Sequence, residues 1–133
     1  MSERRPKLFT PDNCPLTMGY SQIAVVSAGK LAFISGQVGI DAQWRLAPTC
    51  QEQTERAFAN LKAAVEACGG TMANVCKLTI FIVGNVEEGT YSTVRDSYFE
   101  GQVNLPASTF IRVAGLYRPE ALIEIEAVVA IPE

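Results

Sequence analysis

The sequence contains no histidine. This absence excludes Ser-His-Asp and Cys-His nucleophile systems, imidazole metal sites, and the side chain that enzymes use most often as a general base. Any chemistry must therefore run on carboxylates, tyrosine hydroxyls, arginine, lysine, thiols, backbone groups and water.

Cysteine patterns, long apolar runs and clustered positive charge are also missing. The four cysteines, Cys14, Cys50, Cys68 and Cys76, form no C-x-x-C pair and have no zinc-like spacing, so we expect free thiols and no metal. No apolar run approaches the roughly 20 residues of a membrane span, and the first residues lack the apolar segment of a signal peptide. We expect a cytoplasmic protein with no membrane partner. The net charge is −3 and the basic residues are scattered, which disfavours nucleic acid as a partner.

The remaining composition is typical of one globular domain. The chain has 133 residues, of which 48% are hydrophobic and 19% charged, enough to bury a core. Residues 1–133 are predicted to form a single domain that begins with an irregular arm over residues 1–17, where Pro6, Pro11 and Pro15 fall.

Alternating and helical patterns predict the order β-β-α-β-α-β-β. Residues 20–27 and 31–35 are predicted to form a hairpin through a tight turn at 28–30. A helix is predicted from Thr49, which starts a capping box with Glu52, to the glycines at 69–70. Val75–Val83 is predicted to be a central strand, and Asn85 is predicted to cap a second helix. The last two strands follow within residues 105–131.

One face of the predicted sheet has no element left to cover it. Two helices can cover one face of a mixed sheet, in an α+β fold. The other face is also partly apolar, and the residues expected there are Phe33, Phe81, Val83, Val128 and Ala130. We therefore expect this face to be buried against copies of the same chain.

Polar residues whose spacing is typical of a functional site occur only in the stretch 105–131. Alternation places Ser108, Phe110 and Arg112 on one face of a strand, with Thr109 on the other. Glu124 and Glu126 share one face of the final strand, about 7 Å apart. On spacing alone, a solvent-facing strand end is the simpler explanation of this pair of carboxylates.

Several segments in this order and spacing resemble the Rid family, the reactive intermediate deaminases, also called YjgF-like proteins. These segments are LAFISGQVGID, the helix ending in CGG, KLTIFIV and the closing EIEAVVAI. The resemblance covers residues 19–131. It implies a chorismate-mutase-like fold and a homotrimer whose sheets face inward as a barrel, with small-molecule clefts between subunits. It also implies hydrolysis of enamines and imines to a keto compound and ammonia, without metal or organic cofactor.

The family pattern assigns roles to individual residues. Tyr20, in GYSQ, matches the family's tyrosine and Gly36 its strand-end glycine, while Glu124 matches the carboxylate that positions water. Tyr20 and Glu124 are therefore the predicted catalytic residues, and Gly36 is predicted to contact substrate. Sequence alone also allows Tyr20 to be a half-buried strand tyrosine and Gly36 an ordinary strand exit.

The chain departs from the family at Ser108. Deaminating members carry PAR where this chain has PAS, and that arginine binds the substrate carboxylate. Ser108, Thr109 and Phe110 are the predicted substrate-binding residues, with Phe110 making the cleft more apolar. Arg112, Arg118 or a neighbouring subunit are the candidates to replace the missing guanidinium, although Arg112 lies about 13 Å along the strand.

Three functional interpretations follow. The first is an enamine/imine deaminase of altered substrate range. The second is a non-catalytic relative that binds a small metabolite. The third, a ribonuclease or translation inhibitor, fits least well, because the chain is acidic and has no histidine.

Overall fold

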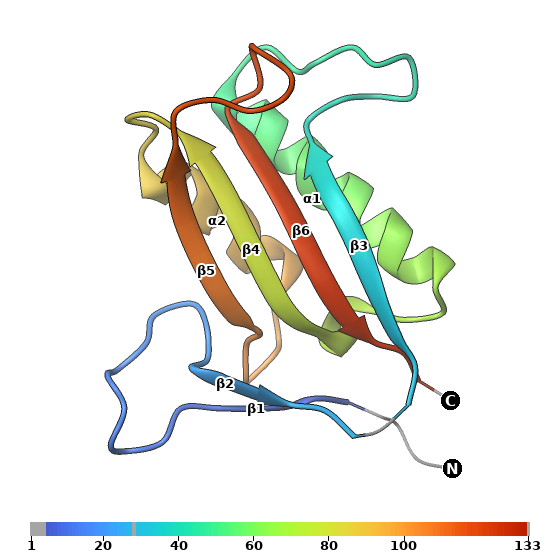
Figure 1. Cartoon of the computed structure of the whole chain (residues 1–133), viewed down its shortest axis with the longest axis vertical. Coiled ribbons are helices and arrows are strands. Elements are labelled where there is room, and N and C mark those ends of the chain that lie inside the picture. Colours follow the sequence, from blue (N-terminus) through green and yellow to red (C-terminus); the bar gives the residue numbers. More distant parts are fainter. Residues whose placement is uncertain (1–4, 28, 133) are drawn as a thin grey trace.

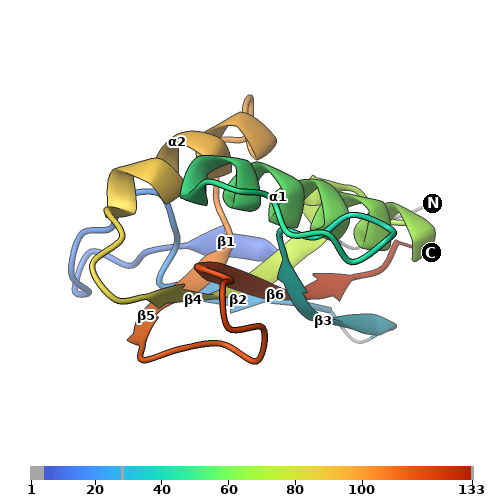
Figure 2. The ribbon, with the colours of Figure 1, turned by 90° about the horizontal axis from the view of Figure 1, so that it is seen from above.

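The computed structural model of the chain describes residues 5–27 and 29–132. Its elements are β1 (Lys7–Phe9), β2 (Ile23–Val25), β3 (Leu31–Val38), α1 (Cys50–Ala67), a 3-10 turn (Met72–Asn74), β4 (Val75–Val83), α2 (Glu88–Tyr98), β5 (Ala107–Val113) and β6 (Ile123–Ala130). Both helices lie on the same face of the main sheet (Figure 2). The predicted α+β class, with two helices on one face, is confirmed.

The main sheet has the strand order β3-β6-β4-β5 (Figure 1). Strand β4 pairs antiparallel with β6 and parallel with β5, so the predicted central position of Val75–Val83 is confirmed. Parallel neighbours need a long crossover, which α2 provides. Leu78 and Ile80 of β4 are buried in the core, and their direct partners on β5 are Ser108 and Phe110. Directly paired residues share a face of the sheet, so Ser108 and Phe110 face the helices.

The predicted hairpin of residues 20–27 and 31–35 is wrong. β3 pairs with β6, and β2 pairs with β1 in a separate two-stranded sheet. Non-local burial overrides the local turn signal, because β6 offers β3 a longer ladder with apolar partners. The predicted turn includes residue 28, which lies outside the described residues.

Strand β1 also corrects the prediction of an irregular arm over residues 1–17. Residues 7–9 are extended and pair with β2, and Leu8 is buried. Residues 1–4 of the arm lie outside the described residues. The apolar Leu8 therefore anchors this segment despite the nearby prolines.

Helix α1 begins and ends where the sequence predicts. The Thr49 hydroxyl accepts a hydrogen bond from the Glu52 backbone N–H at 3.1 Å and lies 2.9 Å from the Glu52 carboxylate. At the other end Gly69 has φ +88°, and the Gly70 N–H donates to the Val65 carbonyl at 3.1 Å. This is the left-handed glycine cap that the pair of glycines indicates.

Helix α2 begins later than predicted. It follows Glu87, and Asn85 does not cap it. The Arg112 Nη1 donates to the carbonyls of Gly84 and Val86 at 2.9 and 2.8 Å. These bonds, together with the positive φ of Gly84 (+60°), hold the segment as a turn and delay the helix.

The face of the main sheet away from the helices is open in the described part of the chain (Figure 2). Phe33 is 75% exposed there, and Leu31 and Ile111 are also exposed. The expectation of a partly apolar second face without a covering helix is therefore confirmed. Among the described residues, neither helix has the length and apolar character needed to cross a membrane.

Candidate functional site

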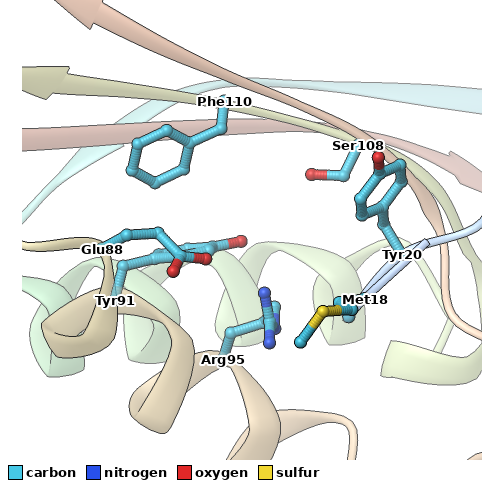
Figure 3. Close-up of a pocket in the computed structure, with 8 residues that line it drawn as sticks. Met18, Tyr20, Glu88, Tyr91, Arg95, Ser108 and Phe110 are labelled. Carbon is cyan, nitrogen blue, oxygen red and sulfur yellow. The ribbon is translucent and has the colours of Figure 1, made fainter. Parts of the chain in front are cut away.

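A pocket between α2 and the first half of β5, called here the helix-side pocket, contains three of the predicted site residues (Figure 3). It has a volume of about 270 Å³, and its lining consists of Met18, Gly19, Tyr20, Glu88, Tyr91, Arg95, Ser108 and Phe110. The segment that carries Tyr20 is held to β5 by a hydrogen bond from the Ser21 N–H to the Pro106 carbonyl at 3.0 Å. The fold thus brings Tyr20, Ser108 and Phe110 together.

Tyr91 of α2 forms the inner wall of this pocket. Its ring packs against Phe58 of α1 and Phe110 of β5, with centroid distances of 5.8 and 5.5 Å. The side chain is only 2% exposed, and its hydroxyl has no hydrogen-bond partner among the described residues. Burial raises the pKa of Tyr91 well above the ordinary value of a phenol, although the nearby Arg95 charge opposes this shift. The hydroxyl is therefore a neutral donor without a protein acceptor.

Arg95 of α2 brings a guanidinium into the same pocket (Figure 3). Its side chain is 12% exposed and forms an ion pair at 2.8 Å with Asp96, whose side chain is 64% exposed. The guanidinium carbon lies 5.5 Å from the centroid of the Tyr91 ring. Gly19, with φ +79°, also lies against the guanidinium, which an added Cβ would overlap. Arg95 thus packs on both an aromatic ring and a glycine backbone.

Arg95 is not among the residues predicted from the sequence. Arg112 and Arg118, the candidates within the chain, are committed elsewhere: Arg112 binds the carbonyls that precede α2, and Arg118 Nη1 donates to the Trp44 carbonyl at 2.7 Å. Neither lines the helix-side pocket. An arginine in the last turn of a helix is common, so only the approach of Gly19 and β5 in space distinguishes Arg95.

Glu124 and Gly36 form part of a second pocket, on the open side of the sheet, called here the sheet-side pocket. It has a volume of about 310 Å³, and its lining consists of Gly36, Gln37, Val38, Ile40, Trp44, Tyr117, Arg118 and Glu124. The Glu124 side chain lies against the Cα of Gly36 so closely that an added Cβ would overlap its carboxylate. The absence of a side chain at Gly36 is therefore what permits this close approach of Glu124.

Thr109 lies in neither pocket. It is exposed, on the open face of the sheet, and it lies 2.6 Å from the Lys77 Nζ, which donates to its hydroxyl. Glu126, also exposed on this face, is one strand repeat from Glu124. Burial lowers the pKa of Lys77, and the charge of Glu126 acts in the opposite direction. The strand alternation thus separates Thr109 from Ser108 and Phe110.

The described residues offer no evident metal site. No three Cys, Asp or Glu side chains within residues 5–27 and 29–132 gather closely enough to hold an ion. All four cysteines lie in this part of the chain and are free thiols, as the sequence predicts. The polar groups of the two pockets are therefore the chemical resources of the site.

Comparisons with known proteins agree with this architecture. Residues 12–131 match the family model described as Endoribonuclease L-PSP. The chain is 33% identical over 131 residues to the 2-iminobutanoate/2-iminopropanoate deaminase of Rattus norvegicus, covering 96% of this chain and 92% of that protein. The corresponding protein of Mus musculus is 34% identical, with 96% and 93% covered.

Solved structures show the same fold. The Rid-family protein YyfB of Yersinia pestis has a TM-score of 0.88 at 28% identity, with 96% of this chain and 99% of that chain covered. TdcF of E. coli, solved with bound serine, has a TM-score of 0.71 at 29% identity, with 93% and 98% covered. The chain therefore belongs to the Endoribonuclease L-PSP family, the Rid family that its sequence motifs resemble.

Proposed function

We propose that this protein is an imine/enamine deaminase that hydrolyses reactive imino intermediates to a keto compound and ammonia. The observation that carries the proposal is the contact between Glu124 and Gly36, two residues assigned by the family pattern that meet at a pocket wall. The curated relatives named as deaminases, at 33–34% identity over nearly the whole chain, support the same chemistry.

Imine hydrolysis needs a positioned water and a group that moves protons. Water oxygen attacks the C=N carbon while the Glu124 carboxylate accepts the water proton, and the imine nitrogen takes up a proton. In the resulting carbinolamine the amino nitrogen takes back the proton held by Glu124, the C–N bond breaks to release ammonia, and the hydroxyl loses its proton as the C–O bond becomes a carbonyl. An enamine enters the same sequence after protonation at carbon. Tyr20 is assigned the role of proton donor, and the reaction uses neither metal nor organic cofactor.

The catalytic cleft is proposed to lie between subunits of a homotrimer. Tyr20 and Glu124 line pockets on different faces of one protomer, so one small substrate reaches both only if a second copy supplies one of them. The exposed Phe33 and Leu31 on the open sheet face supply an apolar surface for that assembly. Ser108, in place of the family arginine, alters the substrate range.

The experiment compares Glu124→Gln with the matched control Glu126→Gln, which lies on the same strand and face. Release of ammonia and keto acid is measured from enzymatically generated 2-imino acids. Loss of the base in Glu124→Gln is expected to lower the rate by about 100-fold or more, and Glu126→Gln by less than about threefold. Equal losses in two folded variants would overturn the assignment of Glu124.

Binding without hydrolysis is the second candidate function, favoured by the loss of the PAR arginine at Ser108. A wild-type protein that binds 2-oxo acids but releases no ammonia from any imino acid would support it. Ribonuclease activity, which the name of the family model suggests, has the least support. The net charge is −3, and the chain has no histidine for acid–base chemistry on a phosphodiester.

A further inference from the structure

Two polar groups of the helix-side pocket have fewer hydrogen-bond partners than buried polar groups usually have. The Tyr91 hydroxyl is buried without an acceptor among the described residues, and the Arg95 guanidinium, which interacts with it, is itself a donor. Arg95 is 12% exposed, and its ion-pair partner is the largely exposed carboxylate of the adjacent residue Asp96. A solvent-exposed ion pair contributes little, so it does not offset the loss of water around a buried guanidinium.

The remaining hydrogen-bonding capacity of Arg95 is available to a ligand. Asp96 Oδ1 accepts from Nε and lies 2.8 Å from Nη2. The guanidinium also interacts with the Tyr91 hydroxyl, and its remaining N–H groups are left for a ligand. Tyr91 and Gly19 both pack against the guanidinium. In Figure 3 the guanidinium, the Tyr91 hydroxyl and the Ser108 hydroxyl point toward the same space. Three donors on two elements thus converge on one space, in a pocket that Glu88 also lines.

We propose that the helix-side pocket binds the carboxylate of the substrate, and that Arg95 of α2 supplies the guanidinium that the strand position Ser108 lacks. This inference rests on the proposed deaminase function for the identity of the substrate, a small 2-imino acid. It replaces the altered substrate range expected from Ser108 alone with a retained preference for carboxylates. Ser108 then acts as an additional hydroxyl donor. The substitution moves the anion-binding group from β5 to α2 and keeps the preference for carboxylates.

The other charged group of the pocket refines the ligand class. Glu88, at the start of α2, is exposed and lines the same pocket. This carboxylate repels every negative charge on a ligand, so it opposes a dianion more than a monoanion, whereas an N–H next to the ligand carboxylate would donate to it. The pocket therefore favours monoanions with a nitrogen beside the carboxylate over dianions such as phosphate.

The test measures binding of pyruvate and of its uncharged analogue pyruvamide to the full-length protein by calorimetry or ligand-observed NMR. Both ligands are stable, so binding is separated from hydrolysis. Wild type is expected to prefer pyruvate by about 10-fold or more, as for a charge-assisted contact. Arg95→Met is expected to reduce the preference to about one while retaining affinity for pyruvamide. Arg56→Met, which removes the same charge from the exposed face of α1, is the matched control and is expected to keep the preference.

Two further variants show whether a loss of preference in Arg95→Met comes from the missing guanidinium or from misfolding. Arg95→Lys keeps the charge and loses the planar fork, and it is expected to retain part of the preference. Adding Ser108→Arg to Arg95→Met returns a guanidinium to the strand and is expected to restore pyruvate binding. A wild type without preference for pyruvate, or a folded Arg95→Met variant that keeps the preference, would overturn the inference. If Arg95-dependent binding occurs without any ammonia release from imino acids, only the deaminase proposal fails.

Discussion

The two pockets differ in how their charged groups are held. In the helix-side pocket, the Arg95 guanidinium is almost buried, fixed between Tyr91 and Gly19, and close to a hydroxyl without a partner. In the sheet-side pocket, the Glu124 carboxylate is only half-buried and lies against Gly36 on an open apolar face. The first arrangement suits the proposed carboxylate site, whereas the second leaves Glu124 on a face that the proposed assembly would enclose.

This difference suggests a division of labour between binding and proton transfer. The sheet backbone separates the two pockets within one protomer, because Ser108 faces the helices and Glu124 the open side. A carboxylate needs a fixed donor set to be recognised, and a general base needs water close to the reacting carbon. Each pocket supplies one of these requirements, and assembly of copies is proposed to combine them.

The largest expected effect comes from breaking the assembly. Phe33→Asp places a charge on the open apolar face, and it is expected to convert the proposed trimer into a monomer of about 14.4 kDa and to abolish hydrolysis. Light scattering and equilibrium sedimentation at micromolar concentration measure the mass. Val103→Asp, at a side chain that is 95% exposed outside the main sheet, is the control. A wild type that is already monomeric, or a monomeric variant that still hydrolyses imines, would show that one protomer suffices.

Whether a feature of the fold can be predicted from the sequence depends on whether neighbouring or distant residues determine it. The ends of α1 follow from neighbouring residues, Thr49 with Glu52 and the glycines at 69–70, and the sequence predicts them correctly. The pairing of β3 with β6 joins segments about 90 residues apart, where apolar burial overrides the local turn pattern. Local signals were therefore sufficient for the two ends of α1, but not for the start of α2, which Asn85 does not cap, or for the choice of strand partners.

The candidate site shows the same limit. Tyr20, Ser108 and Phe110 lie in one pocket and Gly36 and Glu124 in another, whereas the family pattern assigned all five to one cleft. Thr109 does not join them, although strand alternation alone already places it on the opposite face. Arg95 has no motif and becomes distinctive only when the Gly19 turn packs on it. A residue such as Arg95, whose role depends on contact with a segment distant in the sequence, has no characteristic spacing pattern.

A smaller effect is expected from a change confined to the sheet-side pocket. In Gly36→Ala the new methyl group must displace the Glu124 carboxylate. We expect the rate of hydrolysis to fall by about 10-fold or more, because the displaced carboxylate is no longer positioned to accept the proton of the attacking water. The preference for pyruvate over pyruvamide is expected to stay within about twofold of wild type. Gly89→Ala, where an added Cβ meets no atom within 4 Å, is the control. Loss of the pyruvate preference in Gly36→Ala would show that the two pockets are not independent.

The smallest effect concerns stability and the unpartnered hydroxyl of Tyr91. Tyr91→Phe removes a buried polar group that has no partner, so the free energy of unfolding at pH 7 is expected to stay equal or to rise by about 1 kcal/mol, while pyruvate binding weakens. A purely structural tyrosine would not change ligand binding.

The pKa of Tyr91 is raised in the folded state, so above pH 10, near the pKa of an unfolded tyrosine, the unfolded chain loses this proton first. Wild-type stability is then expected to fall with rising pH by at most about 1.4 kcal/mol per unit from this group, and Tyr91→Phe lacks that loss.

Denaturant unfolding of both proteins at pH 7, 9 and 10.5 and at one protein concentration measures this difference, because assembly makes stability depend on concentration. Tyr98→Phe, on the same helix but in the lining of neither pocket, is the control, and its binding of pyruvate is expected to stay like that of wild type. The gap between Tyr91→Phe and wild type should widen only at the highest pH. A constant gap, with pyruvate binding intact, would mean that the hydroxyl is neither buried as a neutral donor nor available to the ligand, and the helix-side pocket would then bind through Arg95 and Ser108 alone.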